Sequence, residues 1–190
     1  MSNGSLDLNF RVAVADDAVE LQPFVRSAYR GESSRKGWTT EADLLADERI
    51  DVEGLKEKIT TPDSAVLLAT DDAGVLVACC EVAKSADGVG YFGMFAVDPD
   101  RQGGGLGRRV LEYAEGYCSR VWGVTKMEMS VIWTREELIS WYVRRGYKKT
   151  GVQKPFPYAE LVNGVALRDD LYFEVMEKDL TADPVVSSTA

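Results

Sequence analysis

Histidine is the residue that this chain of 190 residues lacks altogether. Its absence excludes the Ser-His-Asp and Cys-His schemes of nucleophilic catalysis, and it excludes metal sites that use histidine ligands. A catalytic acid or base must therefore be a carboxylate, a tyrosine, a lysine, a cysteine or water.

Cysteine is scarce, and the three that occur, Cys79, Cys80 and Cys118, show no C-x-x-C spacing. Their odd number argues against a disulfide framework and against a zinc site, so we predict no metal. Free thiols are typical of a reducing compartment. The first residues show no basic segment followed by an apolar one, so we expect no secretory signal and a cytoplasmic location.

Long hydrophobic runs and an excess of positive charge are also lacking. The longest apolar run, Ala73 to Cys80, is far shorter than the roughly 20 residues that cross a bilayer, so we expect no membrane partner. Lysine and arginine number 22 against 31 aspartates and glutamates, which gives a net charge of -9. Because such a surface repels phosphate backbones, we expect no nucleic-acid partner, and the charge weakly favours cationic substrates.

The hydrophobic content of 45% is ordinary for a globular protein, and the length suits one domain. We assign residues 9–180 to a single domain, preceded by a flexible segment, residues 1–8, and followed by a flexible tail, residues 181–190. Neither a repeat nor a linker interrupts the chain.

Glycine is concentrated after an apolar run, Tyr91 to Val97, and immediately before a helical pattern that starts at Leu106. The glycines of this turn are Gly103, Gly104, Gly105 and Gly107. A strand, a glycine turn and a helix start expose backbone N–H groups with no Cβ in the way. Together with the positive end of the helix, these groups form a site for a diphosphate.

The spacing of the turn excludes two common phosphate sites. A G-x-G-x-x-G/A dinucleotide loop fails because Arg108 or Val110 stands at its last position, and a P-loop fails because Gly107 is followed by arginine. The sequence Gln102-x-x-Gly105-x-Gly107 instead resembles the Q/R-x-x-G-x-G/A signature of the GNAT superfamily of acyl-CoA-dependent N-acyltransferases. A plain glycine turn that caps a helix is the alternative.

The resemblance implies that the loop amides bind the pyrophosphate of acetyl-CoA and that the preceding strand pairs with the pantetheine arm. The residues that it assigns to this co-substrate are Phe95, Ala96, Val97, Gln102, Gly103, Gly104, Gly105, Leu106, Gly107 and Arg108.

Periodicity along the rest of the chain predicts the fold class. Strands are predicted at residues 10–15, 65–70, 75–84, 89–97, 126–132 and 170–178. Helices are predicted after the capping box at Asp17, after Thr40, over residues 52–60, from Leu106, and from a capping box at Thr134 to Gly146. Meandering strands before a strand-helix-strand-helix half indicate an α+β fold. This order matches the GNAT architecture, a mixed, mostly antiparallel sheet with helices on both faces in three layers.

The last predicted helix carries the candidate acid. Its ending, Tyr142-x-x-x-Gly146-Tyr147, resembles the second GNAT motif, which implies that Tyr142 protonates the departing thiolate. A phenol with an ordinary pKa of about 10 suits that role. The alternative is an aromatic core residue beside Trp141. Many family members carry an asparagine near the start of this helix, but Arg135 stands there in this chain, so that role is not transferred.

The candidate base is Glu81, which stands between Cys80 and Val82 in an apolar strand. Partial desolvation there would raise its pKa toward a useful value. An outward-facing Glu81, with water as the proton acceptor, is the alternative. A backbone N–H near Phe95 or Ala96 would meet the oxyanion. We expect direct transfer in a ternary complex, because no histidine can activate a cysteine.

The family places its acceptor pocket between the first helix, the loop after it and a late hairpin. In this chain the matching candidates for substrate binding are Tyr29, Arg30 and Trp38. Arg30 could pair with a substrate carboxylate or be a surface charge, and Trp38 could pack onto the core instead.

These expectations together predict an N-acetyltransferase that moves the acetyl group from acetyl-CoA to a primary amine. The predicted acceptor is a small molecule. Acetylation of a protein lysine or N-terminus is one alternative, and a catalytically silent acyl-CoA-binding sensor is another. The sequence leaves open the amine, the acyl-chain preference and the oligomeric state, for which a homodimer is one option.

Overall fold

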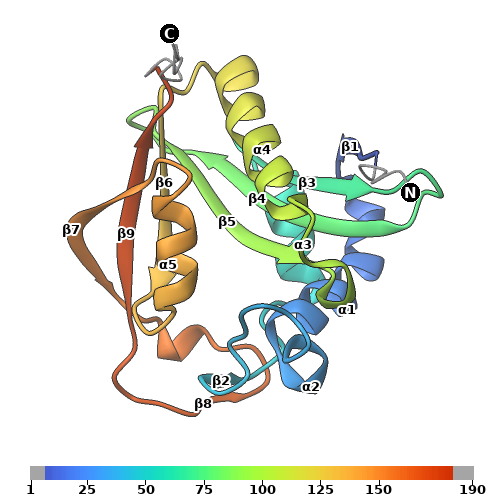
Figure 1. Cartoon of the computed structure of the whole chain (residues 1–190). Helices are drawn as coiled ribbons and strands as arrows, with labels where there is room; N and C mark the ends of the chain where they lie inside the picture. The colour runs from blue at the N-terminus through green and yellow to red at the C-terminus, as the bar shows by residue number, and fades with distance from the viewer. Residues whose placement is uncertain (1–6, 182–190) are drawn as a thin grey trace, which may run out of the picture.

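A seven-stranded sheet with the strand order β1-β3-β4-β5-β6-β9-β7 forms the centre of the molecule (Figure 1). The structure, a computed structural model, describes residues 7–181. Its strands are β1 (Asn9–Val12), β3 (Ser64–Thr70), β4 (Leu76–Lys84), β5 (Gly90–Val97), β6 (Lys126–Ile132), β7 (Lys148–Pro155) and β9 (Tyr172–Asp179). Only the pairing of β5 with β6 is parallel. The predicted mixed, mostly antiparallel sheet is therefore confirmed.

Helices cover both faces of this sheet (Figure 1). Helices α4 (Leu106–Trp122) and α5 (Glu136–Val143) share one hydrophobic cluster with the sheet, and α1 (Ala18–Tyr29) and α3 (Val52–Thr60) share another. Alternation along the strands separates the two clusters: Leu67 and Cys80 face α4, whereas Leu68 and Cys79 face α1. The chain thus has the three layers that the sequence predicted. Among residues 7–181, no helix combines the length and the apolar character needed to span a membrane.

Strand β5 is the element that opens the sheet. Its parallel ladder with β6 contains only the pairs Gly90↔Met127 and Tyr91↔Glu128, and the two strands separate beyond them (Figure 1). On its other side the ladder with β4 shifts register, which leaves Met94 and Phe95 in a bulge, and Met94 has a φ of 42°. A bulge bends a strand and disrupts the ladder locally. The second half of β5 therefore borders an opening in the sheet.

The segment after α1 differs from the prediction. The expected helix after Thr40 is absent, and Leu45–Ala46 instead forms a short strand, β2, which pairs with β8 (Val165–Ala166). The hydroxyl of Thr40 accepts a hydrogen bond from Ala42 at 3.0 Å and so closes a tight turn. Two leucines at adjacent positions gave too little periodicity to specify a helix. A four-residue helix, α2 (Gly31–Ser34), lies in the stretch expected to be a loop.

Helix α5 starts without the capping box predicted at Thr134. Arg135 is the N-cap, and the buried hydroxyl of Thr134 has no hydrogen-bond partner. Strand β7 was not predicted at all, because it is an exposed edge strand with little apolar alternation. The first strand ends at Val12 rather than at residue 15. The predicted flexible segments lie outside the described residues, apart from residues 7, 8 and 181.

Candidate active site

The glycine turn before α4 offers a row of free amides. Gly103, Gly104 and Gly105 have φ values of 101°, 61° and 78°, a left-handed conformation that costs other residues roughly 1–2 kcal/mol each. Among the described residues, the backbone N–H groups of these three glycines, of Gly107 and of Arg108 donate to no acceptor. Three successive left-handed residues therefore require glycine, and the turn leaves its donors for a ligand.

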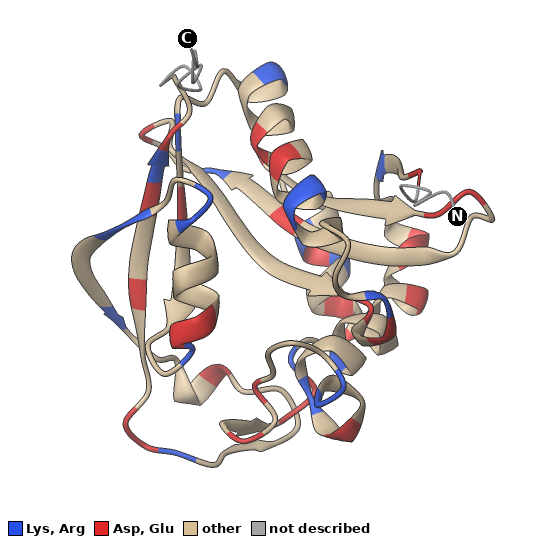
Figure 2. Ribbon diagram, in the orientation of Figure 1, with Lys and Arg blue, Asp and Glu red and all other residues tan. Residues whose placement is uncertain are grey.

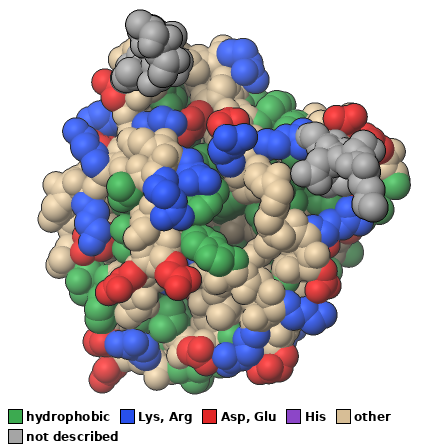
Figure 3. Space-filling view, viewed as in Figure 1, with side chains coloured by type: hydrophobic (Ala, Val, Ile, Leu, Met, Phe, Trp, Pro, Cys, Tyr) green, Lys and Arg blue, Asp and Glu red, His purple; other side chains and the backbone are tan. Residues whose placement is uncertain are grey.

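A cavity of about 590 Å³ lies against this turn and is strongly cationic. Its charged lining residues are Lys36, Arg108, Arg135, Arg144 and Arg145, and in the described part of the chain no aspartate or glutamate lines it. Figure 2 shows Lys and Arg at the start of α4 and at the end of α5, and Figure 3 shows blue side chains around a hollow with hydrophobic side chains inside. A protein with a net charge of -9 thus holds a positive cavity.

Arg145 shows how strongly the cations of this cavity crowd one another. Burial, followed by the charges of Arg144 and Arg108, lowers the pKa of Arg145 from its ordinary value. Its Nε is buried without a hydrogen-bond partner. A bound anion would relieve both the repulsion and the unpaired donor, so the cavity is suited to phosphate groups.

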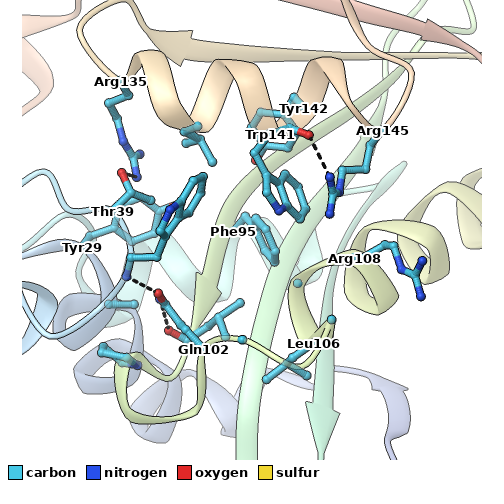
Figure 4. Close-up of a pocket in the computed structure, with 18 of the residues that line it drawn as sticks. Tyr29, Thr39, Phe95, Gln102, Leu106, Arg108, Arg135, Trp141, Tyr142 and Arg145 are labelled. Atoms are coloured by element: carbon cyan, nitrogen blue, oxygen red, sulfur yellow. Dashed lines mark hydrogen bonds between the residues drawn. The ribbon is translucent and has the colours of Figure 1, made fainter. Parts of the chain in front are cut away.

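The inner wall of the cavity is aromatic and apolar. Phe95 and Trp141 lie with ring centroids 6.2 Å apart, and Trp141 meets Tyr142 at 5.2 Å (Figure 4). A Cβ on Gly107 would lie 3.4 Å from the Phe95 ring and 3.5 Å from Trp141. The wall can pack against an uncharged chain that runs inward from the cationic rim.

Gln102 joins two segments that are far apart in the sequence. Its side-chain oxygen accepts a hydrogen bond from the backbone N–H of Trp38, and its amide nitrogen donates to Val97 O at 3.4 Å (Figure 4). Trp38 is 47% exposed and lines the cavity rather than the core. The motif glutamine thereby holds the loop after α2 beside the glycine turn.

A second cavity, of about 360 Å³, lies along β5 and β6. The residues that line both cavities are Tyr29, Phe95, Arg135, Leu138 and Tyr142. They stand where β5 and β6 have separated, so the opening in the sheet places the two cavities side by side. A ligand in one can meet a ligand in the other at this shared wall.

Tyr142 is one of two tyrosines in the shared wall, and Tyr29 is the other. Tyr142 is 4% exposed, and burial, followed by neighbouring Tyr29, raises the pKa of its phenol well above the ordinary value. Within residues 7–181 the hydroxyl makes no hydrogen bond. Tyr142 therefore keeps its proton at neutral pH, and its raised pKa makes it a weaker acid than the ordinary phenol that the sequence suggested.

Two of the predicted site residues form ion pairs and do not line the two cavities. Glu81 is 9% exposed, and both its oxygens accept hydrogen bonds from Lys58 Nζ, at 2.9 and 2.8 Å. Arg30 is 5% exposed and is bonded to Glu41 and Asp47. Neither lines either cavity, whereas Tyr29 lines both and Trp38 lines the larger one. The structure thus brings Tyr142, Tyr29 and Trp38 together, but not Glu81 and Arg30.

The sequence did not predict several cavity residues. Arg144 and Arg145 follow Tyr142 by two and three positions. A search for cationic residues close to the motif would therefore have identified them. Arg49 and Lys154 line the second cavity but come from distant loops and strands. No spacing in the sequence connects these two, and only the fold brings them together.

The sequence matches a model of the GNAT acetyltransferase family over residues 23–152. This range includes the second half of α1, the glycine turn and α5, and therefore the wall between the two cavities. No curated protein matches the chain significantly.

Solved structures share the fold at low identity. The ribosomal-protein-alanine N-acetyltransferase from Escherichia coli has a TM-score of 0.66 and 14% identity over 95% of this chain and 98% of its own. A spermidine N-acetyltransferase chimera from Vibrio cholerae and hSSAT has a TM-score of 0.65 and 14% identity over 91% and 95%. PaiA N-acetyltransferase from Thermoplasma acidophilum, in complex with coenzyme A, has a TM-score of 0.64 and 17% identity over 92% and 99%.

Proposed function

This chain belongs to the GNAT family of acetyltransferases, and from that premise we propose that it moves the acetyl group of acetyl-CoA to a primary amine of a small molecule, by direct transfer in a ternary complex. The observation that carries the proposal is the wall that the two cavities share at Tyr142. One cavity suits a phosphorylated cofactor, and the other leaves room for a second reactant.

The residues of the larger cavity fit acetyl-CoA. The free amides of the turn from Gly103 to Arg108 would hold the pyrophosphate, and Arg144 and Arg145 would neutralise further phosphate charge. The edge of β5 from Phe95 to Val97 would pair with the pantetheine arm, because β6 has moved away from it. Acetyl-CoA supplies the acetyl group already activated as a thioester.

The chain's own groups then assist transfer at the shared wall. Tyr142 holds a proton that the leaving sulfur can accept, and burial keeps that proton in place until it is needed. The bulge at Met94 and Phe95 frees this part of β5 from its ladder, so a backbone N–H there is a donor for the acetyl oxygen.

Direct transfer is supported by the state of the thiols. Cys79, Cys80 and Cys118 are all buried, and burial raises the pKa of Cys79 and of Cys118 to about 12. No thiolate is therefore available to form an acyl-enzyme. Since Lys58 occupies both oxygens of Glu81, we propose that water in the second cavity accepts the proton from the amine.

The volume of the second cavity favours a small acceptor. A site of about 360 Å³ lies at the lower end of the range for small-molecule pockets. The known neighbours do not decide the substrate, because one acts on spermidine and another on a ribosomal protein.

Release of free thiol from acetyl-CoA tests the proposal. We expect release that depends on an added small primary amine and an acetylated product that mass spectrometry identifies. Tight binding of acetyl-CoA without release for any amine in a broad panel would instead indicate a sensor. Release with peptides alone would indicate a protein acetyltransferase.

A further inference from the structure

Arg49 places a guanidinium in the second cavity, where none of the described residues forms an ion pair with it. Its side chain is half-buried and lies over the ring of Tyr29, with Cζ 5.0 Å from the ring centroid. Across residues 7–181 it makes neither a hydrogen bond nor an ion pair. By contrast, Arg30 on the same side of the fold is held by two carboxylates. A guanidinium left unpaired beside a cavity has its donors ready for an anionic ligand.

The backbone at Arg49 is strained so as to hold the side chain there. Its φ is 67°, a left-handed value that few residues other than glycine adopt. Ile50 N donates to Glu48 O at 2.8 Å, which makes Arg49 the central residue of a tight three-residue turn, and Glu48 N donates to Val162 O at 2.8 Å. Strain of this kind persists only where the surroundings fix it, and it gathers at functional sites.

The other charges of the cavity add to that of Arg49. The cations among its lining residues are Arg49, Arg135 and Lys154, and Glu41 is the carboxylate there. Glu41 is already bonded to Arg30 and, at 2.8 Å, to Arg135. The nearby carboxylate of Glu81 is likewise neutralised by Lys58. The cavity is therefore positive, although the whole chain is negative.

We propose that the acceptor is a primary amine that also carries a carboxylate, of the amino-acid type, and that Arg49 binds this carboxylate. The inference rests on the proposed function and names the substrate class of the same site. The planar fork of Arg49 matches a carboxylate in two parallel hydrogen bonds, and Lys154 adds charge at the mouth of the cavity. Bound in this way, the molecule leaves its amine free to reach the wall at Tyr142.

Local charge thus reverses the weak preference for cations that the net charge suggests. A polyamine would bring several positive charges next to Arg49, Arg135 and Lys154. Like charges in a partly desolvated cavity repel each other more strongly than in water. The inference therefore predicts that polyamines are poor acceptors here.

The experiment compares each of a panel of L-amino acids with its α-amide, and it includes spermidine. The amide keeps the amine and the side chain but lacks the carboxylate. We expect thiol release with at least one amino acid, and KM for its amide higher by about ten-fold to a hundred-fold, as expected for loss of a charged hydrogen-bonded pair. Thermal shift with coenzyme A present gives a second readout, since only the amino acid should stabilise the complex.

Arg49→Gly separates binding from folding, because glycine adopts a φ of 67° without strain. We expect the Tm to stay or rise, KM for the amino acid to rise about ten-fold to a hundred-fold, and KM for the amide and for acetyl-CoA to stay within about two-fold. The matched control is Arg26→Gln, which removes an exposed arginine paired with the neighbouring Glu48 and should leave all three KM values unchanged.

Equal turnover of amino acids and their amides, or unchanged KM values in Arg49→Gly, would overturn the inference. The proposed acetyl transfer would not be contradicted by either result. Efficient acetylation of spermidine alone would likewise overturn only the inference. An absence of thiol release with every amine, despite coenzyme A binding, would overturn the proposed function and this inference with it.

Discussion

At the scale of single residues, burial decides which side chains can take part in chemistry. Tyr142 is buried, and its hydroxyl has no hydrogen-bond partner in the part of the chain that the structure describes, so its proton is held and still available. Glu81 and Arg30 are enclosed too, but their charges are already satisfied by Lys58 and by Glu41 with Asp47. A buried ion pair that loses one partner leaves an uncompensated charge, so such residues favour structural roles.

Replacing Tyr142 by phenylalanine tests the acid. We expect kcat to fall by about a hundred-fold, whereas affinity for acetyl-CoA stays nearly unchanged, because the ring remains in the wall. The pKa of Tyr142 is raised, so the wild-type phenol stays protonated and should cause no loss of kcat as pH rises to ordinary alkaline values. Steady-state kinetics across pH and calorimetry with acetyl-CoA provide the measurements. Unchanged turnover in the variant would remove Tyr142 from the mechanism.

At the scale of elements, the strand β5 and the turn before α4 form the site together. The bulge in β5 bends the strand away from β6, and the three left-handed glycines then bring the chain into α4 with its amides exposed. The first turn of any helix has unpaired N–H groups. Here the glycine turn adds more of them, and Gly103, Gly105, Gly107 and Arg108 line the cavity.

Substituting valine for Gly105 tests the turn. Gly105 has a φ of 78°, and Gly74 in the turn between β3 and β4 has the same φ with no atom within 4 Å of an added Cβ at either site. Both substitutions should therefore destabilise the fold similarly, by roughly 1–2 kcal/mol. Only Gly105→Val should weaken coenzyme A binding, by about ten-fold or more, because its side chain occupies the space that the amides face.

Calorimetry with coenzyme A and chemical denaturation measure the two effects. Equal affinity in Gly105→Val and Gly74→Val would show that the turn does not bind the cofactor.

At the scale of the whole molecule, charge is distributed unevenly. The chain carries a net charge of -9, and its acidic residues are spread over many elements (Figure 2). The larger cavity nevertheless has cations from the loop after α2, from the start of α4 and from the end of α5. The cations of the cavity attract an anionic ligand such as coenzyme A, whereas the negative surface of the whole protein repels it. Both effects depend on ionic strength.

Salt should weaken coenzyme A binding by several-fold between about 50 mM and about 500 mM KCl, because the distant repulsion is already largely screened at the lower concentration and further salt mainly weakens the attraction of the nearby arginines. The double substitution of Arg144 and Arg145 by glutamine should flatten this dependence. The same double substitution at Lys148 and Lys149, which are exposed on β7, changes the net charge equally. It should leave unchanged the slope of coenzyme A affinity against salt concentration. Identical slopes for both double variants would contradict a specific role for the cavity arginines.

The sequence by itself determined the layers of the fold and identified residues that line the larger cavity. Alternating strands and amphipathic helices need only local spacing, and the glycine turn, Gln102 and Tyr142 are adjacent to the elements that place them. Residues whose position follows from their own backbone conformation or from a contiguous motif can be located without the fold.

The tertiary structure decided which residues line the second cavity. Arg49 and Lys154 are 105 positions apart, and they line the same cavity only because the fold brings β7 and the loop before α3 to it. The structure also decided that Arg30 is paired with Glu41 and that Glu81 is paired with Lys58. These pairs depend on which charges the packing of the chain brings beside each residue. Long-range contacts carry no periodicity along the chain, so the sign of the charge in the second cavity emerges only when the chain is folded.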